Sequence, residues 1–317
     1  MNWVRPDQKS IRPRRVFRAI FIALLLTGLS GLNGLSARTS QPATFSSPAE
    51  AFSALVEAFR NADSSQLTAL LGPSGKALFS AEDRSEGSRA EQFLKDYQVK
   101  HRLEEVSPNK VVLHVGMTDW PWPFPVVRVG KRWRFDIDQG QKEILARRIG
   151  RNETGAVQVC LAYVDAQQEY AREHHSAEGA GEYAQKFMSD QGKKNGLCWI
   201  SGKEEKQSPV GPLLANACQV NEAGERSNEM ATPYYGYYYK ILTGQGREAT
   251  GGAYSYLVRG RMIGGFALVA YPASYGHSGI MTFMVSQDGV VYEKNLGPKT
   301  EGIAKALKVF NPDKSWK

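Results

Sequence analysis

The pattern of apolar and polar positions predicts three helices at the start of the folded chain. Ser47, Pro48 and Glu50 have the order of an N-cap, a first-turn proline and a capping box. The apolar residues that follow recur at helical spacing: Phe52, Leu55, Val56 and Phe59. A second helix is predicted over 63–71, and a short third helix near Phe93.

From residue 98 the apolar residues alternate with polar ones, which predicts strands. The expected strands cover 98–106, 111–117, 126–129 and 132–135. Gly130-Lys131 has the order of a tight hairpin turn. Helices followed by an antiparallel meander predict an α+β domain over 48–148. This element order resembles the helix-on-curved-sheet domains of the nuclear-transport-factor-2-like and cystatin-like kind.

The second half predicts another α+β domain, over residues 149–317. We expect a long helix from 152 to about 173, then a loop-rich middle with a short helix at 183–188. A final helix is expected over 300–309, after an Asp288-Gly289 hairpin turn. The expected strands cover 234–242, 253–258, 265–271, 280–285 and 290–292.

Residues 1–37 have the pattern of an export signal. Four arginines (Arg12, Arg14, Arg15 and Arg18) precede the apolar run 19–26, which is far shorter than the ~20 residues of a membrane-spanning helix. We expect cleavage near Ala37, a flexible leader over 38–47, and a periplasmic or secreted protein. Arg14-Arg15-Val16-Phe17 resembles a twin-arginine signal, so the export route stays open. An uncleaved signal segment is the alternative, and the only membrane contact that we expect.

Removal of this segment changes the meaning of the net charge. The whole chain has a net charge of +8 and a pI of about 9.3, which at first suggests a nucleic-acid partner. Residues 1–37 hold six of the 40 Lys and Arg and one of the 32 Asp and Glu, so the remainder has 34 and 31, a net of +3. We therefore expect no nucleic-acid partner.

Several motifs resemble those of an exported bacterial family, domain of unknown function 2950. They are Gly-Gly-Phe-Ala-Leu-Val-Ala-Tyr-Pro-Ala-Ser-Tyr-Gly at 264–276, Ser-Gly-Ile-Met-Thr-Phe at 278–283, Gln-Asp-Gly-Val-Val-Tyr at 287–292, Ile-Gly-Arg-Asn-Glu at 149–153 and Trp-Arg-Phe-Asp at 133–136. The resemblance covers nearly the whole mature chain and implies its fold and its export.

The second half is also similar to the soluble heads of type IV pilins and pseudopilins. The shared features are a helix ending in Ala-Gln-Gln-Glu-Tyr at 166–170, a Gly-Tyr-rich strand at 236–238 and the Asp288-Gly289 hairpin. The resemblance implies a pilin-like long helix packed on an antiparallel sheet. In pilins that helix continues upstream as an apolar stem, whereas residues 147–151 here are Arg-Arg-Ile-Gly-Arg. A filament subunit is therefore not expected.

The sequence contains no complete motif for catalysis, metal binding or a cofactor. Gly276-His277-Ser278-Gly279 comes nearest to a nucleophile elbow, but the second glycine is out of place. His174-His175 are adjacent, so both cannot face one ion from a helix. Asp136 and Asp138 are expected to cap a helix that begins near Gln139. We expect no catalytic residues, no metal and no cofactor.

Aromatic residues supply the candidate binding surface. Trp-Pro-Trp-Pro-Phe-Pro at 120–125 predicts a rigid extended path, and the tyrosines at 234–239 should alternate between buried and exposed positions. His277 adds an ionisable group in a glycine-flanked loop. The candidate surface residues are Trp120, Trp122, Phe124, Tyr235, Tyr237, Tyr239, Tyr275 and His277. Packing of these rings into a core is the alternative.

The three cysteines predict one disulfide and one free thiol. Cys198 and Cys218 lie in the loop-rich middle, and their pairing in an oxidising compartment would stabilise the fold by about 3 kcal/mol. Cys160 lies on the apolar face of the long helix and is expected to be a buried free thiol. Pairing of Cys160 with either loop cysteine is the alternative.

These features favour a non-catalytic, exported binding or scaffolding protein of the bacterial cell envelope. Its partner would be an envelope protein or a small ligand. The alternatives are a periplasmic hydrolase-like enzyme with a pocket at the domain interface near His277, and an accessory protein of a pilus or secretion machine.

Overall fold

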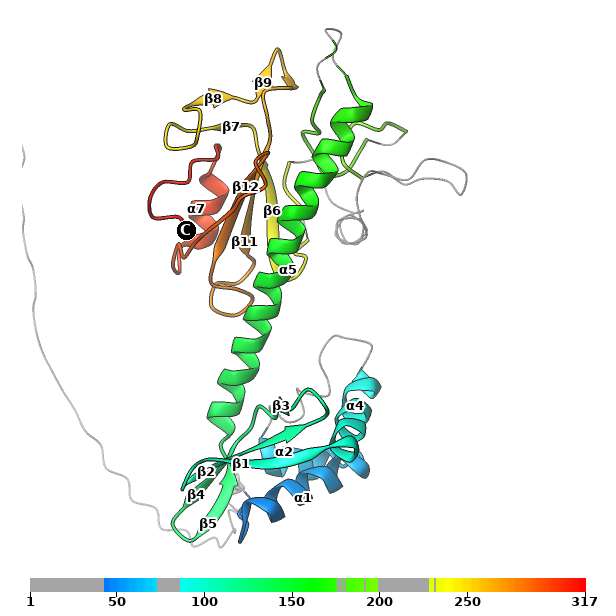
Figure 1. Ribbon diagram of the computed structural model, residues 1–317, viewed down its shortest axis with the longest axis vertical. Coiled ribbons are helices and arrows are strands. Elements are labelled where there is room, and N and C mark those ends of the chain that lie inside the picture. The colour runs from blue at the N-terminus through cyan, green and yellow to red at the C-terminus, as the bar shows by residue number, and fades with distance from the viewer. Residues whose placement is uncertain are drawn as a thin grey trace, which may run out of the picture. The chain divides into compact units, whose positions relative to one another are not determined.

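The computed structural model describes residues 43–72, 86–175, 179, 181–190, 192–198, 228–230 and 232–317. In this part of the chain the fold is mixed α+β with antiparallel sheets, as the sequence predicts (Figure 1). The described helices are α1 (Pro48–Arg60), α2 (Ser64–Leu71), α4 (Glu86–Val99), α5 (Ile137–Glu173) and α7 (Thr300–Ala306).

The first two helices begin where the sequence predicts. The Ser47 side chain accepts a hydrogen bond from the Glu50 backbone N–H at 3.2 Å, and the Glu50 carboxylate in turn accepts from the Ser46 backbone N–H at 2.8 Å. Asp63 caps α2 by accepting from the backbone N–H groups of Ser65 and Gln66. Both predicted N-termini are confirmed.

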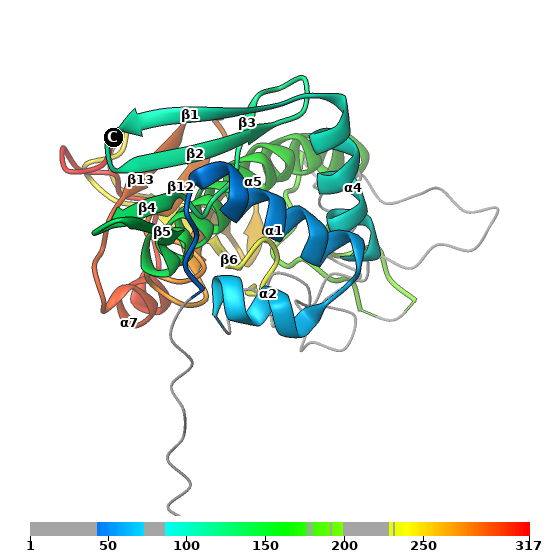
Figure 2. The same cartoon turned by 90° about the horizontal axis from the view of Figure 1, so that it is seen from below.

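The first sheet has the strand order β1-β2-β4-β5, with β3 on β2, and every pairing is antiparallel. Its strands are β1 (His101–Ser107), β2 (Lys110–Val115), β3 (Trp120–Pro121), β4 (Val126–Val129) and β5 (Arg132–Phe135). The four predicted strands are present, but the first begins at His101 and not at residue 98, because α4 continues to Val99. β3 is an addition from the proline-rich segment. Helices α1 and α2 cover the sheet (Figure 2), and Phe52 packs edge-on against Phe135 in the shared core.

Helix α5 is much longer than the sequence predicts. The expected start at residue 152 is wrong, because the helix runs for 37 residues from Ile137. Asp136 caps it by accepting from the Gln139 backbone N–H at 3.0 Å, so the expected cap near Gln139 belongs to this same helix. The run at 147–151 contains no proline and therefore does not interrupt the helix. The predicted domain boundary at 148/149 thus falls inside a helix.

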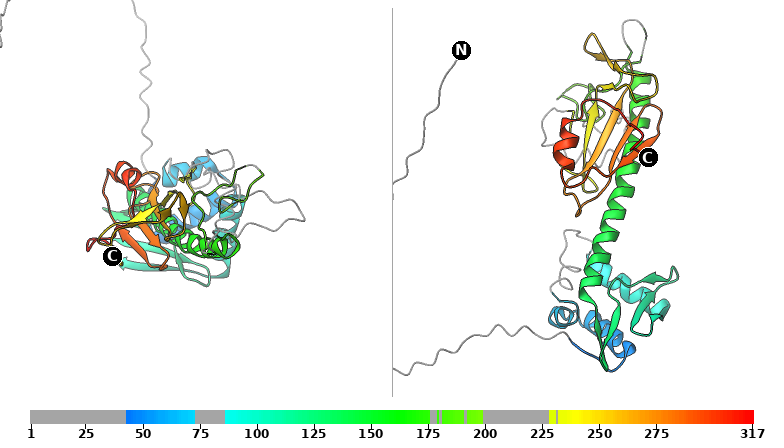
Figure 3. Two further views of the ribbon diagram at one scale, coloured as in Figure 1. Left: turned by 90° about the horizontal axis from the view of Figure 1, so that it is seen from above. Right: turned by 90° about the vertical axis from the view of Figure 1, so that its left-hand side faces the viewer.

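The second sheet is a four-stranded antiparallel sheet between α5 and α7 (Figures 1 and 3). Its strands are β6 (Tyr237–Leu242), β11 (Ala267–Pro272), β12 (Thr282–Ser286) and β13 (Val291–Lys294), in the order β13-β12-β11-β6. On the α5 side the Tyr163 hydroxyl donates to the Ala267 carbonyl at 3.3 Å. On the α7 side the Lys240 ammonium donates to the Lys305 carbonyl at 2.6 Å.

Two predictions for the connecting segments are wrong. Residues 183–188 do not form a helix, because Tyr183 bridges to Met262 and Met188 to Cys198. The expected strand over 253–258 divides at Tyr256 into β8 (Tyr254–Ser255) and β9 (Leu257–Val258). β8 pairs with β7 (Gly244–Gln245), and β9 pairs with β10 (Arg261–Met262). Tertiary pairing therefore overrides the local pattern in both places.

The buried apolar residues form two separate clusters. One joins α1, α2 and α4 to the first sheet, and Ile144 of α5 packs against it. The other joins α5 from Ala156 onward to the second sheet and extends to Phe310. None of the helices in the described part of the chain is both long enough and apolar enough to cross a membrane.

Candidate functional site

The candidate functional site comprises Trp120, Trp122 and Arg147, which we call the indole–arginine site. Its backbone is held by β2: Trp120 pairs with Val115, and the Trp122 N–H donates to the Leu113 carbonyl at 2.7 Å. Prolines between the aromatic residues restrict the backbone of this segment, so its rings project from a rigid support.

Only the first ring of this segment lies at the surface. Trp120 is 42% exposed, whereas Trp122 is 7% and Phe124 0% exposed. The prediction that Trp122 and Phe124 lie at the surface is therefore wrong. Beyond β3 the segment turns into the core, where the Trp122 ring packs 4.7 Å from that of Phe93.

Helix α5 lies directly against the segment. A Cβ atom at Gly140 would come within 2.0 Å of the Phe124 ring, so only a glycine allows this approach of helix and ring. Two turns further along, the Arg147 guanidinium carbon is 4.7 Å from the centre of the Trp120 ring, a cation–π contact. The Arg147 Nε donates to a Glu143 carboxylate oxygen at 2.8 Å.

Among the described residues, two buried donors of the indole–arginine site have no acceptor. They are Nε1 of Trp122 and Nη1 of Arg147. Both side chains lie next to the Trp120 ring: the Trp122 ring centre is 6.2 Å from its centre, and the Arg147 guanidinium carbon 4.7 Å. A buried donor without an acceptor costs about 1–3 kcal/mol, and nearly all such groups in proteins are paired. Both unpaired N–H groups therefore belong to side chains that lie next to the Trp120 ring.

A cluster of charged groups holds the turn before Trp120. The Arg102 Nε donates to both carboxylate oxygens of Asp119, at 2.9 and 3.0 Å, and Arg102 Nη1 donates to Glu104 at 2.9 Å. His114 Nδ1 lies 2.8 Å from the Asp119 carbonyl oxygen. The hydrogen bonds from Arg102 lower the pKa of the Asp119 carboxyl. The sequence does not predict this cluster, because Arg102 lies on β1 and Asp119 lies 17 residues later, in the turn before β3.

The remaining surface candidates lie on two loops bound to α5, at 234–236 and 274–281. The Asn152 amide donates to the Ser278 carbonyl at 2.8 Å. One Glu153 carboxylate oxygen accepts from the backbone N–H groups of Ile280 and Met281 at 2.9 and 3.0 Å. On the other loop the Tyr235 ring lies against Gly155 of α5, where an added Cβ atom would come within 2.5 Å of the ring. Both loops therefore contact the 152–155 stretch of α5. Tyr235 is 39% exposed, Tyr275 half-buried and His277 exposed.

Tyr237 and Tyr239 are not surface residues, contrary to the prediction. Both are fully buried, because β6 directs these rings toward α5. The Tyr237 hydroxyl donates to the Met281 carbonyl at 2.9 Å, and the Tyr239 hydroxyl donates to the Tyr234 carbonyl at 3.2 Å. Desolvation raises the pKa of both phenols.

The contact between Glu153 and the 274–281 loop gives a testable prediction. Glu153→Ala removes the acceptor of two backbone N–H groups and should lower the free energy of unfolding by about 1–3 kcal/mol. Glu153→Gln keeps an oxygen at the same place, so its free energy of unfolding should fall clearly less than that of Glu153→Ala. Urea unfolding monitored by circular dichroism measures both values. Equal losses in the two variants would contradict the role of this oxygen.

The described residues contain no group of three or more His, Cys, Asp or Glu side chains arranged to hold a metal ion. Asp136 is a helix cap, as expected. Cys160 is a buried free thiol, and Cys198 is disulfide-bonded. Cys218 lies outside the described residues, so its pairing with Cys198 stays a prediction.

A protein-family model matches most of the chain. The chain matches no curated protein, and it matches no solved structure. A family model described as "Protein of unknown function (DUF2950)" matches residues 42–317. The match includes the indole–arginine site, both sheets and the loops on α5. The chain therefore belongs to the DUF2950 family.

Proposed function

We propose that this protein is a non-catalytic, exported binding protein of the bacterial cell envelope, and that the indole–arginine site binds its ligand. The observation that carries the proposal is the pair of buried donors, Trp122 Nε1 and Arg147 Nη1, that have no acceptor in the described part of the chain and belong to side chains next to the exposed Trp120 ring. A bound acceptor would remove the cost of both unpaired groups, which a purely structural packing of these side chains leaves in place.

The donors also indicate the chemistry of the ligand. Both are N–H groups and one belongs to a guanidinium, which binds carboxylates with particular geometric precision. Glu143 occupies the Nε edge of Arg147, which leaves Nη1 for the ligand. The exposed Trp120 ring provides an apolar surface for the part of the ligand next to its charged group. We therefore propose a carboxylate carried on an apolar or ring-shaped group.

Nuclear magnetic resonance of the indole N–H groups tests this proposal. The probes are glucuronate and the dipeptide acetyl-Ala-Ala with a free carboxylate, and the matched neutral probes are methyl glucoside and the amidated dipeptide. We expect a charged probe to shift the Trp122 indole N–H resonance, and its neutral counterpart to have little effect. Trp122→Phe keeps an aromatic ring in the core and assigns the resonance by its absence.

Arginine variants of α5 separate ligand binding from general charge attraction. Arg147→Ala should weaken binding of the active probe by roughly tenfold or more, because one charge-assisted hydrogen bond is lost. Arg148→Ala, the exposed neighbour on the same helix, should leave binding unchanged. If neither charged probe shifts the Trp122 resonance, or if both alanine variants bind equally well, the proposed site is wrong.

Export is a separate part of the proposal. It is supported by the basic and apolar pattern of residues 1–37 and by the disulfide-bonded state of Cys198, since disulfides persist in oxidising compartments. N-terminal sequencing of the protein from fractionated cells should find a periplasmic or secreted chain that begins near Arg38. A cytoplasmic chain with residues 1–37 intact and Cys198 reduced would contradict export.

The finer fold likenesses belong to this proposal as well. Helices α1 and α2 on the first sheet support a nuclear-transport-factor-2-like or cystatin-like fold. The packing of α5 on a four-stranded antiparallel sheet supports a pilin-like fold. We propose that both serve as supports for binding surfaces.

A further inference from the structure

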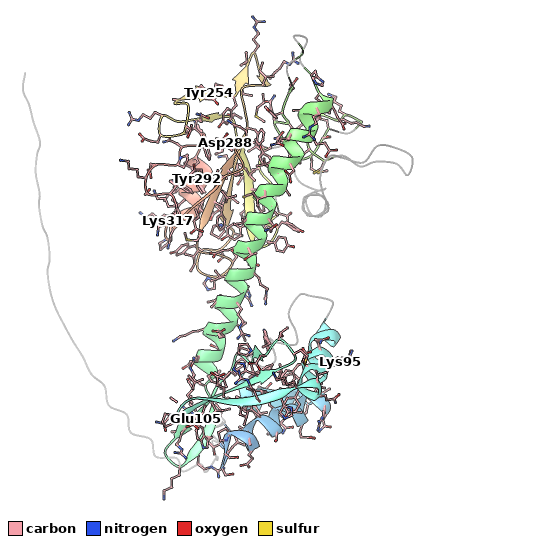
Figure 4. The ribbon with its side chains drawn as sticks, viewed as in Figure 1. Lys95, Glu105, Tyr254, Asp288, Tyr292 and Lys317 are labelled. Atoms are coloured by element: carbon pink, nitrogen blue, oxygen red, sulfur yellow. The ribbon has the colours of Figure 1, made fainter. Side chains whose placement is uncertain are left out.

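The strand orders of the two main sheets end at β1, β5, β13 and β6, and three of these four strands are hydrogen-bonded at their outer edge to other parts of the chain. At β5, Phe45 and Trp133 exchange two backbone hydrogen bonds, at 2.7 and 2.9 Å. At β13, Glu293 and Lys317 also exchange two backbone hydrogen bonds, at 2.9 and 3.1 Å, and Figure 4 labels Lys317 near Tyr292 of this strand. At β6, the Met230 N–H donates to the Tyr239 carbonyl at 2.9 Å. At these positions the edge groups are already paired and are not available to another chain.

The outer edge of β1 is different. Among the described residues β1 pairs with β2 alone, although at seven residues it is the longest strand of the first sheet. Six of its seven residues are exposed, and only Glu104 is half-buried. Leu103 and Val106 are 42% and 53% exposed. Glu105, which Figure 4 labels, lies on this strand.

The hydrogen bonds of β2 show which groups of β1 face outward. The Leu113 carbonyl accepts from the Trp122 N–H, so the peptide groups of Leu113 point away from β1. Leu103 lies opposite Leu113 and therefore forms a non-hydrogen-bonded pair with it. It follows that the N–H and C=O of Leu103 point to the open edge, and those of His101 and Glu105 point the same way.

We infer that β1 pairs with β1 of a second copy of this chain, antiparallel and centred on Leu103. In this register the two Leu103 residues exchange backbone hydrogen bonds across a two-fold axis. Arg102 then lies opposite Glu104 of the second copy, and His101 lies opposite Glu105. Opposite charges at directly opposed positions stabilise a strand pair. The first sheets of the two copies thus become one continuous sheet through the paired β1 strands.

The order of charges in β1 disfavours the neighbouring registers. Centring on residue 101 places Lys100 opposite Arg102, and centring on residue 102 places two copies of Arg102 opposite each other. Centring on residue 104 or 105 opposes two glutamates in the same way. Directly opposed like charges are destabilising. Of the five registers centred on residues 101–105, only that on Leu103 has a neutral centre flanked by opposed charges.

Single cysteine variants test the register. Only the residue on the two-fold axis lies opposite its own copy, at a Cα–Cα distance of about 5.5 Å, which a disulfide can span. We expect Leu103→Cys to form a disulfide-linked dimer under mild oxidation. Val106→Cys, at a more exposed position of the same strand, should not do so, because it faces Lys100 of the second copy. Non-reducing electrophoresis of protein purified after expression with its own leader separates the products.

Charge reversal in the protein without added cysteines provides a second test. Arg102→Glu should raise the dimer dissociation constant, measured by sedimentation, roughly tenfold or more, because two symmetric attractive pairs become repulsive. The double variant Arg102→Glu, Glu104→Arg restores the opposed charges and should recover self-association. Equal crosslinking at positions 103 and 106, no crosslinking at either, or a double variant no better than the single one would overturn the inference.

Discussion

Replacing Phe124 by alanine is expected to lower the free energy of unfolding by about 3–5 kcal/mol. The ring is fully buried and fills the space that Gly140 leaves in α5, so its removal creates a cavity between the helix and the first sheet. Chemical denaturation monitored by circular dichroism measures the loss.

The control is Trp120→Ala, four residues earlier in the same segment. Trp120 is 42% exposed and mainly contacts Arg147 and Trp122, so this change should cost about 1 kcal/mol. A similar cost for both variants would show that the two rings are buried to a similar degree. A much larger loss of unfolding free energy for Phe124→Ala than for Trp120→Ala would show that Phe124 stabilises the fold and that Trp120 is available for binding.

The second large effect concerns the disulfide of Cys198. Cys198→Ser should lower the free energy of unfolding by about 2–5 kcal/mol, since removing a native disulfide relaxes a constraint on the unfolded chain. Dithiothreitol should lower the melting temperature of the unaltered protein by as many degrees as Cys198→Ser lowers it. It should have no further effect on Cys198→Ser or on Cys218→Ser, if these two cysteines are partners.

Cys160 supplies the matched control for this experiment. Burial raises the pKa of its thiol to about 12, so the native protein should resist alkylation at Cys160 at pH 8 and react only after unfolding. Cys160→Ala should retain the full sensitivity to dithiothreitol. Loss of that sensitivity in Cys160→Ala would instead assign Cys160 to the disulfide.

The indole–arginine site and the outer edge of β1 differ in the geometry that binding requires. The indole–arginine site needs two donors next to one ring: Arg147 comes from α5, and Trp122 from the segment that is hydrogen-bonded to β2. The β1 edge needs only an uncovered strand with a suitable order of charges. Because Arg102 also holds Asp119, next to Trp120, pairing of β1 can be checked for an effect on ligand binding with the same Arg102→Glu variant.

The local elements of this protein are determined by its sequence to a large extent. The caps at Ser47 and Asp63 and the hairpin at Gly130-Lys131 depend on residues within four positions of each other, so their hydrogen bonds can be predicted directly. The alternation of apolar residues likewise predicts β4 and β5 at their observed bounds. In these two strands the turn signal and the alternation of apolar residues predict the same bounds.

The tertiary structure decided which aromatic residues reach the surface. Spacing alone cannot tell Trp120 from Trp122, because the difference depends on where the segment leaves β2 and where α5 crosses it. The same is true of Tyr237 and Tyr239, which are buried because α5 covers that face of the second sheet. The continuity of α5 through residues 147–151, and the contact of Arg147 with Trp120, also depend on packing between distant segments. Preferences for helix, strand or turn depend on a few neighbouring residues, whereas the burial of a side chain depends on which distant segment of the chain packs against it.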